Sequence, residues 1–280
     1  MQDVTPGTVA DAGIGAQPSV LVDACLEPGI GLMTLNRPQA RNSLSLAMLQ
    51  TLHAAILQLG QDVTVQAIVL TAAGSVFSAG HDLKEIMAHR ADPDGGRAFY
   101  ELAMTACAQA MQAIMACPKP VIAAVDGTAT AAGCQLVATC DLAVAAEHAK
   151  FCTPGVNIGL FCSTPMVALS RNVSRKAAME MLLTGDLIGA EEAQRIGLVA
   201  RVFDDDDFAG GTSALVGRLA AASPPALRTM KQNFLEAEHL GLAEFAELEA
   251  QRHLQLFTLA DTREAFAAKV EKRASRFTGN

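Results

Sequence analysis

Short apolar runs alternate with longer amphipathic stretches over the chain up to about residue 202. The short runs are rich in Val, Ile, Leu and Ala, which predicts strands, whereas residues 45–59 and 96–116 repeat apolar positions at helical spacing. Strands that alternate with helices indicate an α/β fold. The predicted strands lie at residues 20–23, 31–35, 67–71, 121–125, 142–145 and 198–202.

The pattern changes at a run of four aspartates, residues 204–207. Four adjacent carboxylates on one short segment are typical of a solvated turn or helix start rather than of a metal site. Beyond them no strand-like run follows, and four consecutive helices are predicted at residues 208–222, 224–240, 242–256 and 261–277.

These patterns divide the chain into three parts. Residues 1–17 are rich in Gly, Ala, Pro and Thr without periodicity, which predicts a mobile tail that carries no chemistry. We expect an α/β core at residues 18–205 and a C-terminal helical region at residues 206–280.

Composition restricts the class of partner. With 280 residues and 51% hydrophobic content, the chain is long enough to build one large domain around a substantial core. The 21 basic and 29 acidic residues give a net charge of −8, which argues against a nucleic-acid surface. We therefore expect a small-molecule partner, with a local basic patch as the only place for a phosphate.

The cysteines and the most apolar segment indicate where the protein works. No CxxC pair is present, so neither a zinc site nor a disulfide framework is predicted, and no metal is expected. The N-terminus lacks a basic segment followed by an apolar one, and polar residues and glycines interrupt residues 120–146, so we predict neither export nor a membrane span. A reducing cytoplasm is the expected location. The cysteines are Cys25, Cys107, Cys117, Cys134, Cys140, Cys152 and Cys162.

Two loops of small residues, 78–83 and 127–135, each follow a predicted strand and lead into a predicted helix. Such loops can direct backbone N–H groups at one point and so form an oxyanion hole, which stabilises the negative oxygen of an enolate or a tetrahedral adduct. Either loop alone is more typical of a tight glycine turn.

Residues 35–44, 77–85, 132–136 and 140–142 together resemble the enoyl-CoA hydratase/isomerase (crotonase) superfamily, with the motifs in the family's order from about Val20 to Phe277. The resemblance implies a crotonase-like spiral of ββα turns and a C-terminal helical trimerisation region. It also implies a homotrimer or a dimer of trimers. The implied ligand is an acyl-CoA thioester, with coenzyme A as part of the substrate and no separate cofactor.

The resemblance assigns roles residue by residue. The N–H groups of His81 and Ala132 would be the oxyanion donors. Lys272 would reach a CoA phosphate, often on a neighbouring subunit; a solvated lysine is the alternative there, as an ordinary surface loop is for Arg41. The CoA arm would lie along Gln39, Ala40 and Arg41 and across Ala79, Asp82 and Leu83.

The sequence departs from the family's hydratases at two positions. Gln135 and Gly155 stand where those enzymes carry the two glutamates that handle water and the Cα proton. Positioned acid–base groups contribute about 10²- to 10⁴-fold, so we predict badly impaired hydration. The remaining candidates for proton chemistry are the His81 ring, Asp82, Cys134, Cys162 and Ser163.

Three functions remain open. Residues 132–136 and 153–163 look most like the enoyl-CoA hydratase domain-containing branch, which supplies no reaction. Our primary interpretation is an acyl-CoA-binding protein that acts through an enolate-stabilising oxyanion hole. Residues 78–82 also look like a loop of enzymes that decarboxylate malonyl-type CoA thioesters, which is the first alternative. A non-catalytic acyl-CoA binder is the second.

Overall fold

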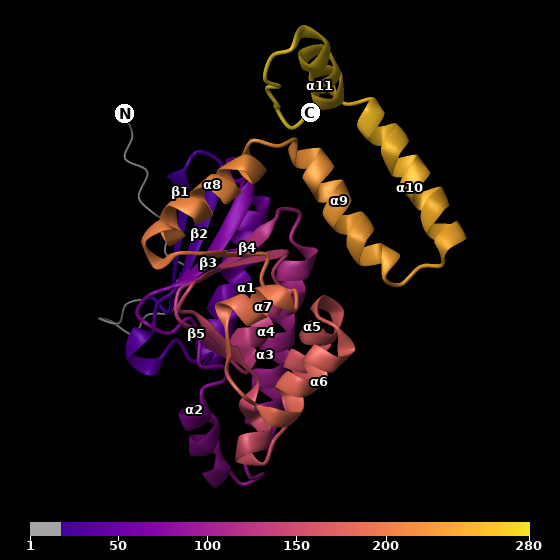
Figure 1. Ribbon diagram of the computed structural model, residues 1–280. Coiled ribbons are helices and arrows are strands. Elements are labelled where there is room, and N and C mark those ends of the chain that lie inside the picture. The colour runs from indigo at the N-terminus through magenta and orange to yellow at the C-terminus, as the bar shows by residue number, and fades with distance from the viewer. Residues whose placement is uncertain (1–17) are drawn as a thin grey trace.

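A six-stranded mixed sheet forms the centre of the molecule (Figure 1). The structure is a computed structural model that describes residues 18–280, so the tail predicted at residues 1–17 lies outside the described residues. The first strand is antiparallel to the second, and all other neighbours are parallel. In spatial order the strands are β1 (Val20–Glu27), β2 (Ile30–Leu35), β3 (Ala67–Ala72), β4 (Val121–Val125), β6 (Leu142–Ala146) and β9 (Arg201–Phe203).

A second, three-stranded sheet holds β5 (Thr128–Thr130), β7 (Lys150–Cys152) and β8 (Ile188–Gly189). β4 belongs to the large sheet, β5 to the small one, and the helix α4 (Ala132–Thr139) follows at once. β6 and β7 repeat this order before the next helices. The chain thus winds in strand–strand–helix turns.

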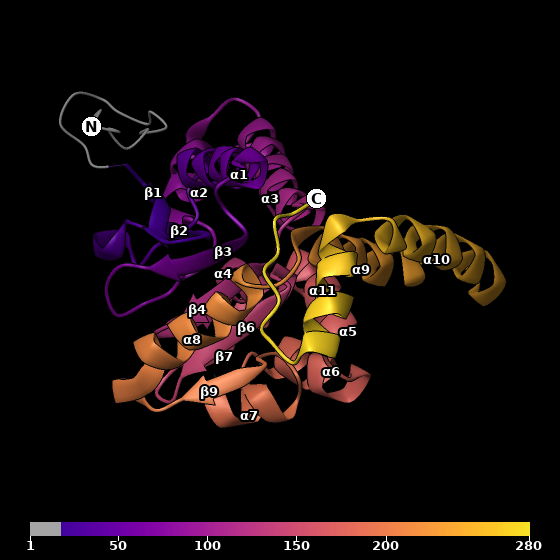
Figure 2. The same cartoon turned by 90° about the horizontal axis from the view of Figure 1, so that it is seen from above.

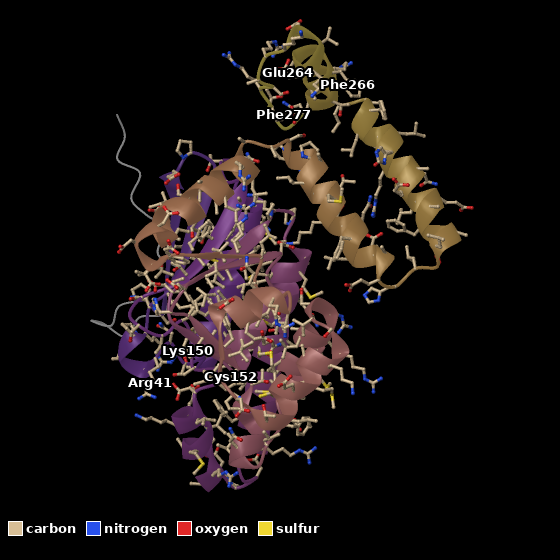
Figure 3. The ribbon with its side chains drawn as sticks, in the orientation of Figure 1. Arg41, Lys150, Cys152, Glu264, Phe266 and Phe277 are labelled. Carbon is tan, nitrogen blue, oxygen red and sulfur yellow. The ribbon has the colours of Figure 1, made fainter. Side chains whose placement is uncertain are left out.

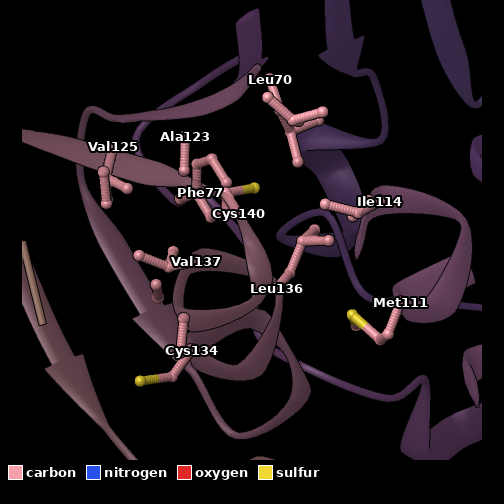
Figure 4. Packing of buried hydrophobic residues seen from close by; sticks show 14 of the residues in the cluster. Leu70, Phe77, Met111, Ile114, Ala123, Val125, Cys134, Leu136, Val137 and Cys140 are labelled. Carbon is pink, nitrogen blue, oxygen red and sulfur yellow. The ribbon is translucent and has the colours of Figure 1, made fainter. Parts of the chain in front are cut away.

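The two faces of the large sheet bury different sets of side chains. Along β3, Ile68 and Leu70 belong to one apolar cluster and Val69 to another, as the alternation of side chains along a strand requires. The first cluster packs under α1 (Leu46–Gln61), α3 (Arg97–Ala116) and α4. Figure 4 shows Phe77, Ile114 and Leu136 within it.

The helix α8 (Phe208–Ala220) covers the other face. Its Leu215 and Val216 are buried against Ile30, Val69 and Ile122 of the sheet. The turn of aspartates before it forms the short 3-10 helix η4 (Asp205–Asp207). The other 3-10 helices are η1 (Pro38–Ala40), η2 (His89–Ala91) and η3 (Pro154–Ile158).

The C-terminal helices α9 (Pro224–Ala237), α10 (Leu242–Phe257) and α11 (Ala260–Glu271) extend away from the sheets (Figures 1 and 2). Neither α9 nor α10 has a buried residue. One side chain anchors α9 to the core: Nζ of Lys231 donates to Oδ2 of Asp141 at 2.7 Å and to the carbonyls of Ile114 and Lys119.

Four predicted boundaries were wrong by three residues or more. β1 continues to Glu27 rather than ending at residue 23, and α9 ends at Ala237 rather than at residue 240. Residues 198–200 are not a strand, because the N–H groups of Leu198 and Val199 turn back onto the carbonyl of Ala193. α11 ends at Glu271 rather than at residue 277, because Lys272 enters the left-handed region with φ 55°. The backbone N–H groups of Thr278 and Gly279 then donate to the buried carboxylate of Asp261.

Several short elements were not predicted, since few residues define each of them. They are β5, β7 and β8, with the helices α2 (Leu83–Ala88), α5 (Ser163–Asn172), α6 (Arg175–Thr184) and α7 (Ala190–Arg195). No helix within residues 18–280 combines the length and the apolar character needed to cross a membrane.

Candidate active site

Ser78 and Ala129 form a parallel β-bridge between the two loops of small residues. The N–H of Ser78 donates to the carbonyl of Thr128 at 3.2 Å, and the N–H of Thr130 donates to the carbonyl of Ser78 at 2.9 Å. The bridge holds the two loops side by side, so His81 and Ala132, each three residues beyond a bridge partner, lie on neighbouring segments.

Two glycines allow this close approach. Gly80 has φ of 81°, and a Cβ built on it would lie 3.1 Å from the backbone nitrogen of Ala132. A Cβ on Gly133 would lie 2.4 Å from the carbonyl oxygen of Ser78. Any side chain at either position would force the loops apart, so both glycines are required for contact and not only for turning.

The N–H of Ala132 is available because Ala132 is the first residue of α4, where backbone donors have no partner within the helix. The preceding Ala131 has φ 50° and ψ −120°, a conformation that costs an L-residue free energy and is found at functional sites. Its own N–H donates to the carbonyl of Cys152 at 2.9 Å, which holds it there. The N-terminus of α4 adds partial positive charge beside the donor.

A cleft of about 1590 Å³ opens beside His81. The structure brings to it the side chains or backbone of all six residues assigned to the CoA arm. Lys272 does not lie there: it caps α11, and the C-terminal Phe266 and Phe277 lie at the top of the molecule, well away from Arg41 (Figure 3). The six cleft residues are Gln39, Ala40, Arg41, Ala79, Asp82 and Leu83.

The two acidic side chains that line the cleft, those of Asp82 and Glu85, already accept hydrogen bonds from other residues of the protein. Asp82 caps α2 by accepting from the N–H groups of Lys84 and Glu85, and its Oδ2 accepts from Ser43 at 3.0 Å. Burial opposes its ionisation, but these hydrogen bonds and the guanidinium of Arg37 hold the pKa of Asp82 below its usual value. The carboxylate is thus a poor base.

Glu85 is used in the same way, because its Oε2 accepts from the N–H of Leu46 at the start of α1. Arg41 and Lys84 also line the cleft, and neither forms an ion pair within residues 18–280. With the acids engaged, these two cations make the cleft suited to an anionic ligand.

The ring of His81 has an unusual environment. Its Nε2 is enclosed without a hydrogen-bond partner among residues 18–280, and burial lowers the pKa of the imidazole, which is therefore neutral at pH 7. Buried polar atoms without partners are few in folded proteins. The ring is thus enclosed and uncharged, and it is too weakly basic to be a cation there.

The positions that the resemblance assigns to the family's glutamates, Gln135 and Gly155, hold no acid. Oε1 of the buried Gln135 accepts from the hydroxyl of Thr164 at 2.8 Å. A Cβ on Gly155 would lie 3.0 Å from Sγ and 2.9 Å from the backbone nitrogen of Cys162. The space for a side chain at residue 155 is therefore filled by the loop that carries Cys162.

The remaining candidates are poor acid–base groups. Burial raises the pKa of the Cys134 and Cys162 thiols and raises that of Cys152 to about 11, so all three are protonated at neutral pH. Ser163 is exposed at the start of α5. Within residues 18–280 no group of three His, Cys, Asp or Glu side chains is arranged to hold a metal ion.

Thr164 is a site residue that the sequence analysis missed. It contacts Gln135 across 29 positions of the chain, and no local motif marks such a contact. Asn42 was missed as well, although it lies next to the predicted CoA-binding residues.

Comparison with known proteins decides the family. The model of the enoyl-CoA hydratase/isomerase family matches residues 26–280, nearly the whole chain. The chain belongs to the enoyl-CoA hydratase/isomerase family. A rat relative, "enoyl-CoA hydratase domain-containing protein 3, mitochondrial", is 39% identical over 269 residues, which cover 96% of this chain and 88% of the rat protein.

Solved structures of this family confirm the crotonase fold. An enoyl-CoA hydratase from Mycobacterium smegmatis is similar with a TM-score of 0.87 and 44% identity, covering 93% of this chain and 99% of that one. Human enoyl-CoA hydratase domain-containing protein 3 gives a TM-score of 0.85 and 39% identity, covering 92% and 99%. The name of the rat relative includes mitochondria, whereas the cytoplasmic location expected for this family member stays a prediction.

Proposed function

We propose that this family member binds an acyl-CoA thioester and stabilises its enolate. The thioester oxygen would accept hydrogen bonds from the N–H groups of His81 and Ala132. The observation that supports this most is the Ser78–Ala129 bridge, which holds the two loops that carry these donors side by side. Donors fixed before the reaction stabilise charge that develops on the oxygen without reorganisation.

The CoA arm would lie in the cleft beside His81. Arg41 and Lys84 are the cations in it without an acidic partner among the described residues, and they are suited to the CoA phosphates. Backbone groups of residues 39–41 would bind the remainder of the arm. This arrangement needs no separate cofactor.

Acid–base chemistry at this site is limited. An amide at Gln135 and no side chain at Gly155 leave no ionised carboxylate at the glutamate positions, so hydration of an enoyl thioester should be slow. Decarboxylation of a malonyl-type thioester is the second candidate function, because loss of CO₂ leaves its electron pair in the enolate and requires no base. An enolate-stabilising hole without a neighbouring carboxylate favours that reaction.

We further propose assembly as a homotrimer or a dimer of trimers through the C-terminal helices. α9 and α10 carry apolar side chains that the single chain leaves exposed, and patches of this kind mark protein interfaces. The exposed side chains are Met230, Phe234, Leu242, Leu254 and Phe257. Light scattering at micromolar protein should give a mass of three or six chains, and a monomer would contradict the assembly.

Titration calorimetry with acetyl-CoA tests the binding proposal. Acetyl-CoA should bind, and Gly133→Ala should weaken it strongly, because the new Cβ would push Ser78 and its loop away. Gly189→Ala is the matched control, since a Cβ there meets nothing within 4 Å. Absence of binding at millimolar acetyl-CoA would contradict the proposal.

A further inference from the structure

Gln135 and Thr164 fix a hydrogen-bond donor beside the oxyanion hole. The hydroxyl of Thr164 donates to Oε1 of Gln135 at 2.8 Å, so the carbonyl end of the amide points at α5. Its NH₂ group must then point the other way. The resemblance places at this position a carboxylate, which accepts protons. In this chain the end of the side chain that is not bound to Thr164 is the NH₂ group, which can only donate hydrogen bonds.

The amide nitrogen has no partner of its own. The enclosed side-chain atoms of residues 18–280 that lack a hydrogen bond are Ser19 Oγ, His81 Nε2 and Thr212 Oγ1. Nε2 of Gln135 is not among them and makes no hydrogen bond to a described residue, so this atom borders open space although the residue is only 6% exposed.

Helix geometry directs this donor at the reacting end of the ligand. Gln135 lies three residues after Ala132 on α4, and residues at this spacing share a helix face. Side chains on a helix lean toward its N-terminus, here toward the N–H of Ala132. A group held at that N–H therefore has its acyl carbons next to the Gln135 amide.

We infer that Gln135 determines specificity for acyl-CoA thioesters that carry a further oxygen acceptor on the acyl chain, either a hydroxyl or a carboxylate. The inference rests on the proposed acyl-CoA binding and names its substrate class. Thr164 is a positioning residue that acts through Gln135. An acyl chain without an oxygen leaves the NH₂ group unpaired, which makes such ligands weaker.

Affinities of three ligands test this class: butyryl-CoA, 3-hydroxybutyryl-CoA and malonyl-CoA, measured by calorimetry with chromatography to check that each stays intact. The intact protein should bind the hydroxyl ligand about 2- to 12-fold, and the carboxylate ligand about 10- to 100-fold, more tightly than butyryl-CoA. If only one of the two oxygen-bearing ligands binds more tightly than butyryl-CoA, that result identifies whether the site takes a hydroxyl or a carboxylate.

Variants separate recognition from packing. Gln135→Glu keeps the size and the bond from Thr164 but replaces the donor, so it should abolish the preference while butyryl-CoA still binds. Thr164→Val should reduce the preference and Thr164→Ser should restore it. Gln109→Glu, an exposed change on α3, adds the same charge elsewhere and should have no effect.

The outcomes distinguish this inference from the proposed function. Equal affinities for all three ligands, or a preference that persists in Gln135→Glu, would overturn the inference and leave acyl-CoA binding intact. Binding of none of the three would overturn both. Should Gln135→Glu fail to fold, the ligand preference of the intact protein and its loss in Thr164→Val decide.

Discussion

The hydroxyl of Ser78 donates to the backbone carbonyl of Asn42 at 2.8 Å, and both residues are fully buried. This bond joins the loop that carries His81 to the loop of residues 37–41 that lines the cleft. The N–H of Ala79 strengthens the junction by donating to the carbonyl of Arg41 at 3.0 Å. The cleft and the loop that carries the proposed His81 donor are therefore parts of one hydrogen-bonded unit.

Asn42→Ala should destabilise the protein by roughly 2–5 kcal/mol, because three partly buried backbone groups lose the partner that the buried Asn42 amide provides. The Asn42 amide accepts from the N–H of Arg37 and donates to the carbonyls of Ala73 and Val76. Urea unfolding measures the change. Thr105→Ala removes an exposed hydrogen bond on α3 and should stay within about 0.5 kcal/mol; equal effects of the two changes would refute the network.

Gly155→Ala should destabilise the protein or displace residues 161–162, since the new Cβ would meet Sγ and the backbone nitrogen of Cys162. The obstacle is space, because Gly155 does not adopt positive φ. Gly217→Ala on α8 meets nothing within 4 Å and should stabilise by about 0.5–1 kcal/mol. Thermal unfolding measures the stability of both variants. A stabilised Gly155→Ala protein would show that the loop with Cys162 moves aside without cost, which would contradict this prediction.

Lys231→Met should cost roughly 1.5–3 kcal/mol, because the partly buried carboxylate of Asp141 loses its cation and keeps only the hydrogen bond from the N–H of Val121. The Lys231 side chain is 9% exposed and that of Asp141 25%. Asp141→Asn combined with Lys231→Met should recover part of the loss. Denaturant unfolding of Lys231→Met, Asp141→Asn and the double variant measures the coupling free energy between the two side chains. If the losses of stability in the single variants simply add in the double variant, the two side chains are not coupled.

The cost of Lys231→Met should also depend on pH. Burial raises the pKa of Asp141 above its ordinary 3.8, so its contribution to stability is present below that value and declines as pH rises through the folded pKa. Without the opposing Lys231 the pKa rises further. The variant should therefore be more destabilised at pH 7 than at pH 4, and the reverse order would contradict this account.

Crotonyl-CoA hydration should be several orders of magnitude slower than in family members with two glutamates, at about 10²- to 10⁴-fold per lost group and without full additivity. Gln135→Glu alone should raise the rate, since Thr164 can hold the new carboxylate. A spectrophotometric assay of the enoyl thioester measures both rates. Turnover of the unchanged protein equal to that of two-glutamate relatives would show that another group moves the protons.

The sequence predicted most of the large sheet, because its strands are apolar runs bounded by small or polar residues. β4 has the predicted bounds, and β3 and β6 each run one residue longer. The small sheet was missed, since Thr128–Thr130 and Lys150–Cys152 are too short to show a period. Pairing between distant segments, and not local preference, makes them strands.

Part of the candidate site could likewise be predicted from the sequence, and part could not. The family resemblance predicted residues that line the cleft, whereas the hydrogen bond from Ser43 to Asp82 and the filled space at Gly155 depend on residues far along the chain. The orientation of the Gln135 amide depends on Thr164 in another helix. The location, the domain boundary after residue 205 and the individual site roles stay predictions.

The most direct test of the account is a crystal structure of the protein with bound acetyl-CoA. We predict that the thioester oxygen lies about 2.7–3.1 Å from the backbone nitrogens of both His81 and Ala132, the distances of an oxyanion hole. The CoA arm should occupy the cleft beside Arg41. A thioester oxygen that contacts neither nitrogen, in a fully occupied complex, would contradict the central claim.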